Sequence, residues 1–480
     1  MNNKSNNSVL SVSTLLDFFN LDPNMVLKCE SNRDVNGLSI YITLIKNVHR
    51  CPSCNNSTST IKDYTIKKIK HSILNLERCH IIYRARRYLC TVCKKTFYER
   101  NPFVVKNSKI SSVTVYNVLQ DLKNSTETFT SVAKRYFLST TTVSSIFDKN
   151  VNISRRTFPE IISIDEVYAF KGNRSNYACV LLDFKAQKVI DILPSRRKED
   201  LIRYLSFIPR DERLNVKFAS TDMWETYRIV FKTYFPNATI VVDKFHVLQD
   251  LSRRLMKVRS KILNEIKPPT NINKDNLSYK EKKELEIREN NYYLLKKFSW
   301  LIFKPEPHDP NAEKKYNKKL NRYLNFYDIH TLLLEIHDDL KLIDNSISLI
   351  SRFYRNCTLD NAKATLTEII KVFKSSYLRE LNDFANTLIR WKSEIIASFT
   401  IVGTKIIQER IDGRKVDKTV NVKLTNGIIE GRNKVIKTIK RNANGYGNWL
   451  RFRNRVLYVL NSDTTFNINP LINDNEDTNY

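Results

Sequence analysis

The chain has 480 residues, of which 41% are hydrophobic and 11% aromatic, so it can form substantial cores and is not generically disordered. At this length about three domains are expected. The 80 Lys and Arg residues outnumber the 50 Asp and Glu residues, and the net charge of +30 with a pI near 9.7 favours a polyanionic partner, nucleic acid before an anionic membrane.

No stretch approaches the roughly 20 consecutive apolar residues of a membrane span, and the N-terminus lacks the basic and apolar regions of a signal peptide. The eight cysteines are sparse for this length. In a chain that is not exported they should be thiols or metal ligands. We therefore expect a soluble intracellular protein that binds nucleic acid and has no membrane partner.

Residues 1–105 are predicted to form an N-terminal region with a zinc ribbon, after a short helix and a strand near Leu38–Ile45. Two C-x-x-C pairs can place four thiolates around one Zn²⁺: Cys51, Cys54, Cys90 and Cys93. The 35 residues between the pairs exceed the usual spacing, so the intervening hairpins must be long. His71, Cys79 and His80 lie in that gap and are alternative ligands. Two unrelated pairs of surface thiols are the other interpretation, and Cys29, Cys179 and Cys357 are expected to be ordinary core residues.

Residues 106–155 are predicted to form a helix-turn-helix DNA-binding domain. Within Thr128–Lys149, apolar residues mark two short helices that are separated by a break at Leu138–Ser139. The Ser-Thr-Thr-Thr run that opens the second helix can cap it and contact DNA. A plain helical hairpin is the alternative. The candidate DNA contacts of this domain are Lys134, Arg135, Thr140, Thr141, Thr142 and Ser144.

Residues 156–250 change to short β-rich runs alternating with helical patterns, in the order β-β-β-α-β-α. Asp165 lies within the first predicted strand and Asp222 at the end of the fourth. If the fourth strand pairs beside the first, these two carboxylates are neighbours. Such a pair is costly unless a divalent cation neutralises it, and Mg²⁺ (or Mn²⁺) suits such a site. Glu166, Asp183 and Asp191 are also strand-associated acids, so Asp165 alone would not be singled out.

Residues 251–420 lose the strand signal almost entirely and are predicted to be an α-helical insertion, before final core helices at 421–465 and a disordered tail at 466–480. The helical segment Asn426–Arg441 carries one acid, Glu430. Lys434, Lys437 and Arg441 share its face, whereas Ile428, Val435 and Ile439 lie roughly opposite, with Arg432 as a misfit. Alone, Glu430 reads as a surface partner of Lys434. With Asp165 and Asp222 it becomes the third acid of a two-metal site for phosphodiester chemistry.

Several blocks together resemble bacterial insertion-sequence DDE transposases, most closely the ISL-three family. They are CPSC…RRYLCTVC, the helix-turn-helix, SIDEVYAF, YACVLLD with a following R-x-x-x-x-L, STDMWETY, FPNATIVVDKFHV and TNGIIEGRNKVIKTIKR. The resemblance implies a multidomain α+β/α/β protein, whose RNase H-like mixed-sheet core is interrupted by the helical insertion. By motif, Asp165, Asp222 and Glu430 would be the catalytic triad. Asp243 and His246 match a further family motif, DKFH, whose role the sequence does not give.

The mechanism that the resemblance implies is metal-assisted DNA cleavage at the element ends, followed by strand transfer from the exposed 3′-OH. Lys434, Lys437 and Arg441 would hold DNA phosphates, and the N-terminal module would read the terminal repeats. The implied partners are double-stranded DNA, at the element ends and at the target, and at least one further copy of the chain in a synaptic homodimer. The implied location is the bacterial cytoplasm, in association with the nucleoid.

Two rival functions remain at this stage. One is a non-catalytic, transposase-derived regulator that binds specific DNA, which has no need of three acids. The other is a stand-alone RNase H-like nuclease, which has no need of a DNA-reading N-terminal half.

Overall fold

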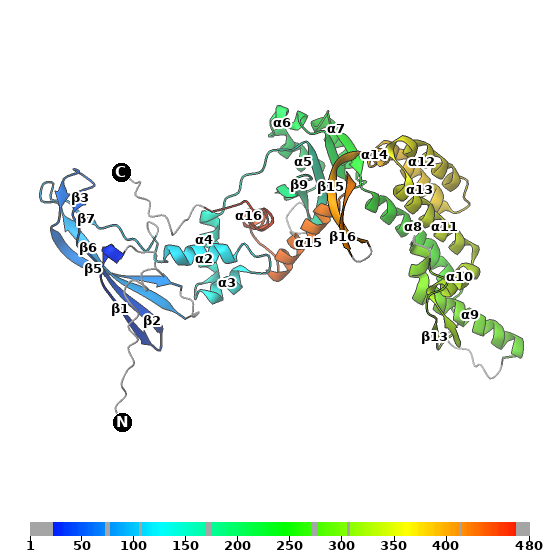
Figure 1. The fold of residues 1–480 in the computed structure, drawn as a ribbon, viewed down its shortest axis with the longest axis horizontal. Coiled ribbons are helices and arrows are strands. Elements are labelled where there is room, and N and C mark those ends of the chain that lie inside the picture. The colour runs from blue at the N-terminus through cyan, green and yellow to red at the C-terminus, as the bar shows by residue number, and fades with distance from the viewer. Residues whose placement is uncertain are drawn as a thin grey trace, which may run out of the picture. The chain divides into compact units, whose positions relative to one another are not determined.

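The computed structural model describes residues 23–72, 77–104, 108–168, 175–269, 277–304, 308–411 and 414–466 (Figure 1). The chain divides into two compact units. The N-terminal unit comprises Met1–Arg155, Val167–Gly172 and Arg432–Tyr480, and the central unit comprises Arg156–Glu166 and Asn173–Gly431. The helix expected before residue 23 and nearly all of the tail expected at 466–480 lie outside the described residues.

A mixed sheet occupies the first part of the N-terminal unit, after a short 3-10 helix, η1 (Pro23–Met25). Its strands run in the order β1-β2-β6-β5, and β7 pairs with β6. Their bounds are β1 (Val26–Asp34), β2 (Gly37–Leu44), β5 (Ile61–His71), β6 (Cys79–Leu89) and β7 (Thr96–Tyr98), and a separate pair is formed by β3 (His49–Arg50) and β4 (Ser57–Thr58). The expected strand near Leu38–Ile45 is β2, whereas β1 was not predicted. Ile40, Ile81 and Tyr83 belong to the core of this sheet.

Three helices follow the sheet: α2 (Ser112–Asp121), α3 (Phe129–Arg135) and α4 (Thr140–Asn150). Ser139 caps α4 by accepting a hydrogen bond from the backbone N–H of Thr142, as the Ser-Thr run predicts. In the turn between α3 and α4, Phe137 has a φ of 52°, a left-handed conformation that favours Gly.

The last described helix, α16 (Trp449–Leu460), packs into the core of α2, α3 and α4. The Tyr458 hydroxyl donates to the Leu119 carbonyl at 2.9 Å, and the buried Arg455 donates to the carbonyls of Asn124 and Glu127. The sequence predicts that all of residues 421–465 belong to the catalytic core. In the structure, Arg432–Tyr480 belongs to the N-terminal unit instead. Helix α16 packs against α2, α3 and α4, with Tyr458 in their core.

The central unit is built on a five-stranded sheet of order β10-β9-β8-β11-β12. The strands are β8 (Ile161–Tyr168), β9 (Tyr177–Asp183), β10 (Lys188–Leu193), β11 (Phe218–Thr221) and β12 (Thr239–Val242), with helices α5 (Lys198–Ser206), α6 (Arg210–Leu214) and α7 (Glu225–Tyr234). Strands β9 and β10 are antiparallel, whereas β8, β11 and β12 are parallel. The fourth strand of the sheet lies beside the first, as the element order predicts.

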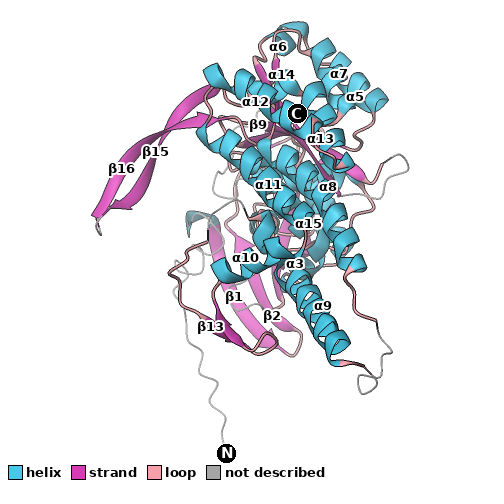
Figure 2. Ribbon diagram, turned by 90° about the vertical axis from the view of Figure 1, so that its right-hand side faces the viewer, coloured by secondary structure: helices cyan, strands magenta, loops and turns pink. Residues whose placement is uncertain are grey.

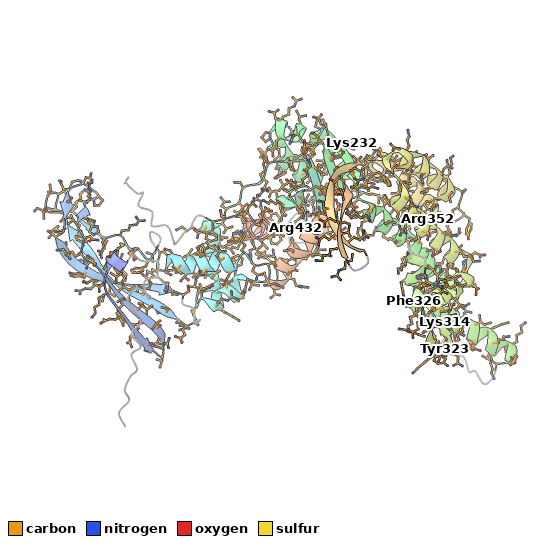
Figure 3. All side chains as sticks on the ribbon, in the orientation of Figure 1. Lys232, Lys314, Tyr323, Phe326, Arg352 and Arg432 are labelled. Atoms are coloured by element: carbon orange, nitrogen blue, oxygen red, sulfur yellow. The ribbon has the colours of Figure 1, made fainter. Side chains whose placement is uncertain are left out.

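A helical region follows the sheet, with α8 (Lys244–Glu265) as its first helix. It continues with α9 (Tyr279–Phe298), η3 (Ser299–Phe303), α10 (Phe326–Ile336), α11 (Asp338–Asn356), α12 (Leu359–Lys374), α13 (Arg379–Arg390) and α14 (Lys392–Ala397), and includes a small hairpin, β13 (Lys315–Asn317) and β14 (Arg322–Leu324). The buried Glu394 of α14 is bound by Arg228 and Lys232 of α7 at 2.9 and 3.4 Å. Figure 3 labels Lys232. These ion pairs join the region to the sheet.

The expectation of helices throughout 251–420 is wrong at its end. A long antiparallel hairpin, β15 (Ile401–Ile411) and β16 (Arg414–Lys423), occupies that stretch. Helix α15 (Gly427–Asn442) comes directly after it and carries Glu430.

Candidate active site

Two of the expected acids lie on adjacent parallel strands, with Asp165 inside β8 and Asp222 directly after the end of β11. Strands β8 and β11 pair with Ser163 opposite Ser220. Two residues further along each strand direction are Asp165 and Asp222, which therefore lie level with each other and on the same face of the sheet as the two serines. Both aspartates are partly buried. The local pairing thus brings together two carboxylates that are 57 residues apart in the chain.

The charges of these acids act on each other. Burial above all, with repulsion from Asp222 and Glu430 in addition, raises the pKa of Asp165 to about 6. The pKa of Asp222 is also raised, chiefly by burial. His246 of α8 acts in the opposite direction on both aspartates. The Oδ1 atom of Asp222 is buried without a hydrogen-bond partner, which is an uncompensated cost that a bound cation would remove.

The first turn of α15 is fastened to the same face of the sheet. The Ser220 hydroxyl donates to the side-chain carbonyl of Asn426 at 2.6 Å, and the backbone N–H of Asn426 donates to Asp243 at 3.1 Å. Asn426 is fully buried, and Glu430 follows one helical turn later, its N–H bonded to the Asn426 carbonyl at 2.9 Å. This anchor brings the Glu430 charge within range of Asp165.

Asp243 and His246, whose roles the sequence left open, both begin α8. The Asp243 side chain is the N-cap of α8 as well as the acceptor for Asn426, so it joins two helices at one point. His246 is partly buried, and its Nε2 atom has no hydrogen-bond partner.

Sequence reasoning missed a guanidinium beside the carboxylates. Arg196 forms an ion pair with Glu166 and lies over the rings of Tyr177 and Trp224, at 4.5 and 4.9 Å from their centroids. Burial and the charge of Asp222 raise the pKa of Glu166 to about 7, although Arg196 opposes the shift. Arg196 is the Arg of the R-x-x-x-x-L pattern, which was the available signal.

The three carboxylates do not by themselves form a tight cage. Among the described residues, only the four cysteines form a group of three or more His, Cys, Asp or Glu residues whose ligand atoms all lie within 4.8 Å of one another. A single ion bound by all three acids would need them closer together.

The four cysteines of the C-x-x-C pairs do converge. The Cys51 and Cys93 sulfurs are 3.6 Å apart, and those of Cys54 and Cys90 are 3.5 Å apart. Ligands of a tetrahedral zinc at about 2.3 Å lie roughly 3.8 Å from each other. The arrangement suggests a structural zinc site, and the alternative ligands His71 and Cys79 pair at the opposite end of β5 and β6.

Each C-x-x-C pair is held by the same backbone pattern. In both pairs the N–H of the first cysteine bonds five residues ahead, and the residue after the second cysteine, Asn55 or Lys94, has a left-handed φ. The backbone N–H of Asn56 lowers the pKa of Cys54 to about 6. The pKa of Cys93 is instead raised to about 11, because burial and the three neighbouring sulfurs outweigh the N–H of Lys95. Cys54 therefore loses its proton more readily than Cys93, and a bound dication would favour deprotonation of Cys93 as well.

The expected DNA contacts of the helix-turn-helix divide into two groups. Lys134, Thr140 and Thr141 are exposed and Thr142 is partly exposed. Arg135, by contrast, is bound to Asp121 and Glu127 within the unit, and Ser144 is only 7% exposed. Arg135 keeps 35% of its side chain exposed, so it stays a predicted DNA contact, whereas Ser144 is nearly inaccessible. Ser145 is the serine of that turn that faces solvent.

Helix α15 presents the expected basic face. Lys434, Lys437 and Arg441 are exposed and line a pocket of about 520 Å³ together with Tyr168, Thr438 and Lys440. The buried face consists of Ile429, Asn433, Ile436 and Ile439, which is one residue away from the expected Ile428 and Val435. Arg432 is partly buried in this helix (Figure 3).

A family model described as "Transposase", that of the ISL3-type DDE transposases, matches residues 162–414 and 413–456, which together make up more than half of the chain. The chain belongs to the ISL3 family of DDE transposases. The transposase for insertion sequence element IS1001 of Bordetella parapertussis is 22% identical over 414 residues, covering 85% of this chain and 88% of that protein. The resemblance drawn from the motifs is thereby confirmed, and the chain is a transposase of an insertion sequence.

The matched range of this transposase contains Asp165, Asp222 and Glu430, whereas the four cysteines and the helix-turn-helix precede it. Family membership implies binding of DNA, its cleavage and strand transfer, and a site for Mg²⁺. Within the ranges that the structure describes, no helix of the transposase is long and apolar enough to cross a membrane.

Proposed function

We propose that this transposase cuts the ends of its element and transfers the exposed 3′-OH to target DNA at a site made by Asp165, Asp222 and Glu430. The observation that carries the proposal is the position of two partly buried aspartates on adjacent parallel strands, Asp165 inside β8 and Asp222 directly after β11, where burial and the charge of Asp222 raise the pKa of Asp165. The strand order 3-2-1-4-5, with three antiparallel-type strands before two parallel ones, supports an RNase H-like core.

The three acids fit divalent metal, because Asp165 and Asp222 have raised pKa values and Asp222 keeps a buried oxygen without a partner. They would hold Mg²⁺ or Mn²⁺, which when bound supplies charge neutralisation at the phosphate and activation of the attacking oxygen. The chain's own contribution is positioning. Asn426, held by Ser220 and Asp243, keeps the glutamate-bearing turn against the sheet.

DNA recognition is divided between elements in this proposal. The terminal repeats would be contacted by the start of α4, since the second helix of such a motif enters the major groove. The contacting residues would be the exposed Thr140 and Thr141 and the partly exposed Thr142 of α4, together with the exposed Lys134 of α3. The basic pocket of Lys434, Lys437 and Arg441 would hold backbone phosphates. Zn²⁺ at the four cysteines would be structural. Synapsis of two element ends calls for at least a homodimer.

The test compares Asp165→Asn, Asp222→Asn and Glu430→Gln with the wild-type protein. Each variant should lose Mg²⁺-dependent cleavage of duplexes that carry the repeats flanking the gene, while it still binds them. Each should also bind Mn²⁺ more weakly in a titration without DNA. Asp183→Asn, at the end of the neighbouring strand β9, is the matched control and should cleave normally.

Full cleavage by Glu430→Gln would remove that residue from the site. A wild-type protein that binds the repeats but cleaves under no metal condition would favour the regulator over the enzyme.

A further inference from the structure

The hairpin of β15 and β16 has a buried base and an exposed remainder. Val402, Val422 and Leu424 pack at its base in one cluster with Ile161 of β8 and Phe218 of β11. Beyond that base, every described residue of 403–419 is exposed or partly exposed, on both faces. Figure 2 shows the two strands extending away from the helices of the central unit. The hairpin is therefore anchored to the strands that carry Asp165 and Asp222, and free elsewhere.

An isolated hairpin of this length is unusual on energetic grounds. The register runs from Gly403 opposite Val422 to Ile411 opposite Arg414, so the paired part is roughly 30 Å long at about 3.4 Å per residue. Two strands alone are only marginally stable in water, and both edges present unpaired backbone groups. Ile406 is 69% exposed and Val416 is 44% exposed. A surface of this kind is typical of a segment that binds a partner.

The two faces of the hairpin differ in chemistry. Residues directly opposite in an antiparallel pair share a face. One face, which we call the polar face, consists of the pairs Thr404–Asn421, Ile406–Thr419, Gln408–Asp417 and Arg410–Lys415. The other face pairs Lys405 with Val420, Ile407 with Lys418 and Glu409 with Val416. On that second face Lys418 is bound to Glu409 at 2.9 Å.

Charge indicates the kind of partner. Residues 401–423 contain six Lys or Arg against three Asp or Glu. Arg410 and Lys415 lie side by side near the free end of the polar face, and the amides and hydroxyls around them can donate to phosphates or base edges. The major groove of B-DNA, about 12 Å wide, admits a two-stranded β-ribbon. An anionic groove thus matches this face in charge and in shape.

We propose that the polar face of the β15–β16 hairpin binds the duplex DNA of the element end that is held at the catalytic carboxylates. Only three residues separate β16 from α15, and they include Asn426, which anchors the turn that carries Glu430. The base of the hairpin shares its apolar cluster with β8. DNA bound along the hairpin is therefore coupled mechanically to the strands and the helix that carry the three acids. The inference rests on the proposed function for the identity of its ligand.

The test uses the full-length protein and two charge-matched double variants. Arg410→Ala/Lys415→Ala changes the polar face, and Lys405→Ala/Lys418→Ala removes two positive charges from the opposite face of the same strands. Affinity for the terminal-repeat duplex is measured between 50 and 200 mM salt. The polar-face variant should lose about two phosphate contacts, so the magnitude of the slope of log K against log salt should fall by about 1.8. The factor by which affinity drops between 50 and 200 mM salt should therefore be about 12-fold smaller than in the wild-type protein. The control should keep the wild-type slope.

Equal slope changes in the two variants would overturn the proposal, because they would reflect net charge alone. A normal slope on the repeat duplex combined with weakened strand transfer into an unrelated duplex would assign the hairpin to target DNA instead. A normal slope combined with loss of self-association in sedimentation would assign it to a second copy of the chain. Failure of the hairpin inference is distinguishable from failure of the proposed function, since Asp165→Asn abolishes cleavage without changing the slope.

Discussion

Replacing Asp165 with Asn should stabilise the metal-free transposase while removing its activity. In the folded protein, burial and the charges of Asp222 and Glu430 raise the Asp165 pKa to about 6 from an ordinary 3.8. An acid whose folded pKa is raised stabilises the fold when protonated, and this stability is lost as the pH rises from the unfolded towards the folded pKa. At neutral pH the ionised carboxylate therefore costs free energy of folding. A neutral amide of the same shape avoids that cost.

The expected gain depends on pH in a defined way. With those two pKa values, Asp165→Asn gains less than about 1 kcal/mol at pH 4, about 2 kcal/mol at pH 5 and about 3 kcal/mol at pH 7.5, relative to wild type. Mg²⁺ at about 100 times its Kd should stabilise the wild-type protein by about 2.7 kcal/mol and the variant by less. Urea denaturation followed by fluorescence, with and without Mg²⁺ at each pH, measures both effects.

Asp183→Asn is the matched control, because it removes a charge from the end of β9 without touching the buried pair. The reasoning fails if Asp165→Asn is no more stable than wild type at pH 7.5, or if its gain is the same at pH 4 and pH 7.5. A stability gain that does not change with pH would mean that the pKa of Asp165 is not raised in the folded protein.

Two further predictions concern the zinc site and the anchor of α15. Elemental analysis should find about one zinc per chain. Cys90→Ser should lose this zinc and open the N-terminal sheet to proteolysis, whereas Cys29→Ser, away from the four-cysteine group, should keep it. Zinc retained in full by Cys90→Ser would contradict the site. Ser220→Ala and Asn426→Ala should each destabilise the protein by about 1–3 kcal/mol, because each leaves a buried partner unpaired. The double variant should lose less than the sum, by about 1 kcal/mol in urea denaturation, and additive losses would mean that the hydrogen bond does not link sheet and helix.

The catalytic sheet was predictable because its signals are local. Residues 161–242 alternate short β-branched runs with helical patterns, and the short connections constrain which strands can be neighbours. Asp165 lies inside β8 and Asp222 directly follows β11, and the parallel pairing of these strands makes the two residues level. The C-x-x-C spacing was equally local, because four thiolates within reach of one zinc need only two tight turns.

The hairpin of β15 and β16 was not predictable from the same signals. A strand is recognised by alternation of apolar and polar side chains. In β16 the valines at 416, 420 and 422 do alternate with polar residues, but Lys418 interrupts them, and β15, with Ile406 next to Ile407, has no such alternation. In α15 two stripes of isoleucine compete, and only packing decides that Ile429 and Ile436 are the buried ones. The same one-residue ambiguity applies to α4, where Ser144 is predicted to contact DNA but Ser145 is the exposed serine.

Contacts between distant segments were also beyond the sequence. Ser220 and Asn426 are 206 residues apart, and neither residue type suggests a buried hydrogen bond. The ion pair of Arg196 with Glu166 depends on where β10 ends relative to β8, which residue spacing does not fix. The sequence thus indicates which residues carry the chemistry more readily than it indicates which residues hold them in place.

The packing of α16 against α2 and α4 bears on how this chain can change by mutation. The core formed with α2 and α4 buries Tyr458 and Arg455 from more than 300 residues further along the chain, so it is complete only once α16 has been synthesised. A stop codon anywhere before Trp449 therefore removes part of that core, even where it leaves residues 1–155 intact. A chain truncated before Trp449 should not persist as a stable folded fragment of its first 155 residues.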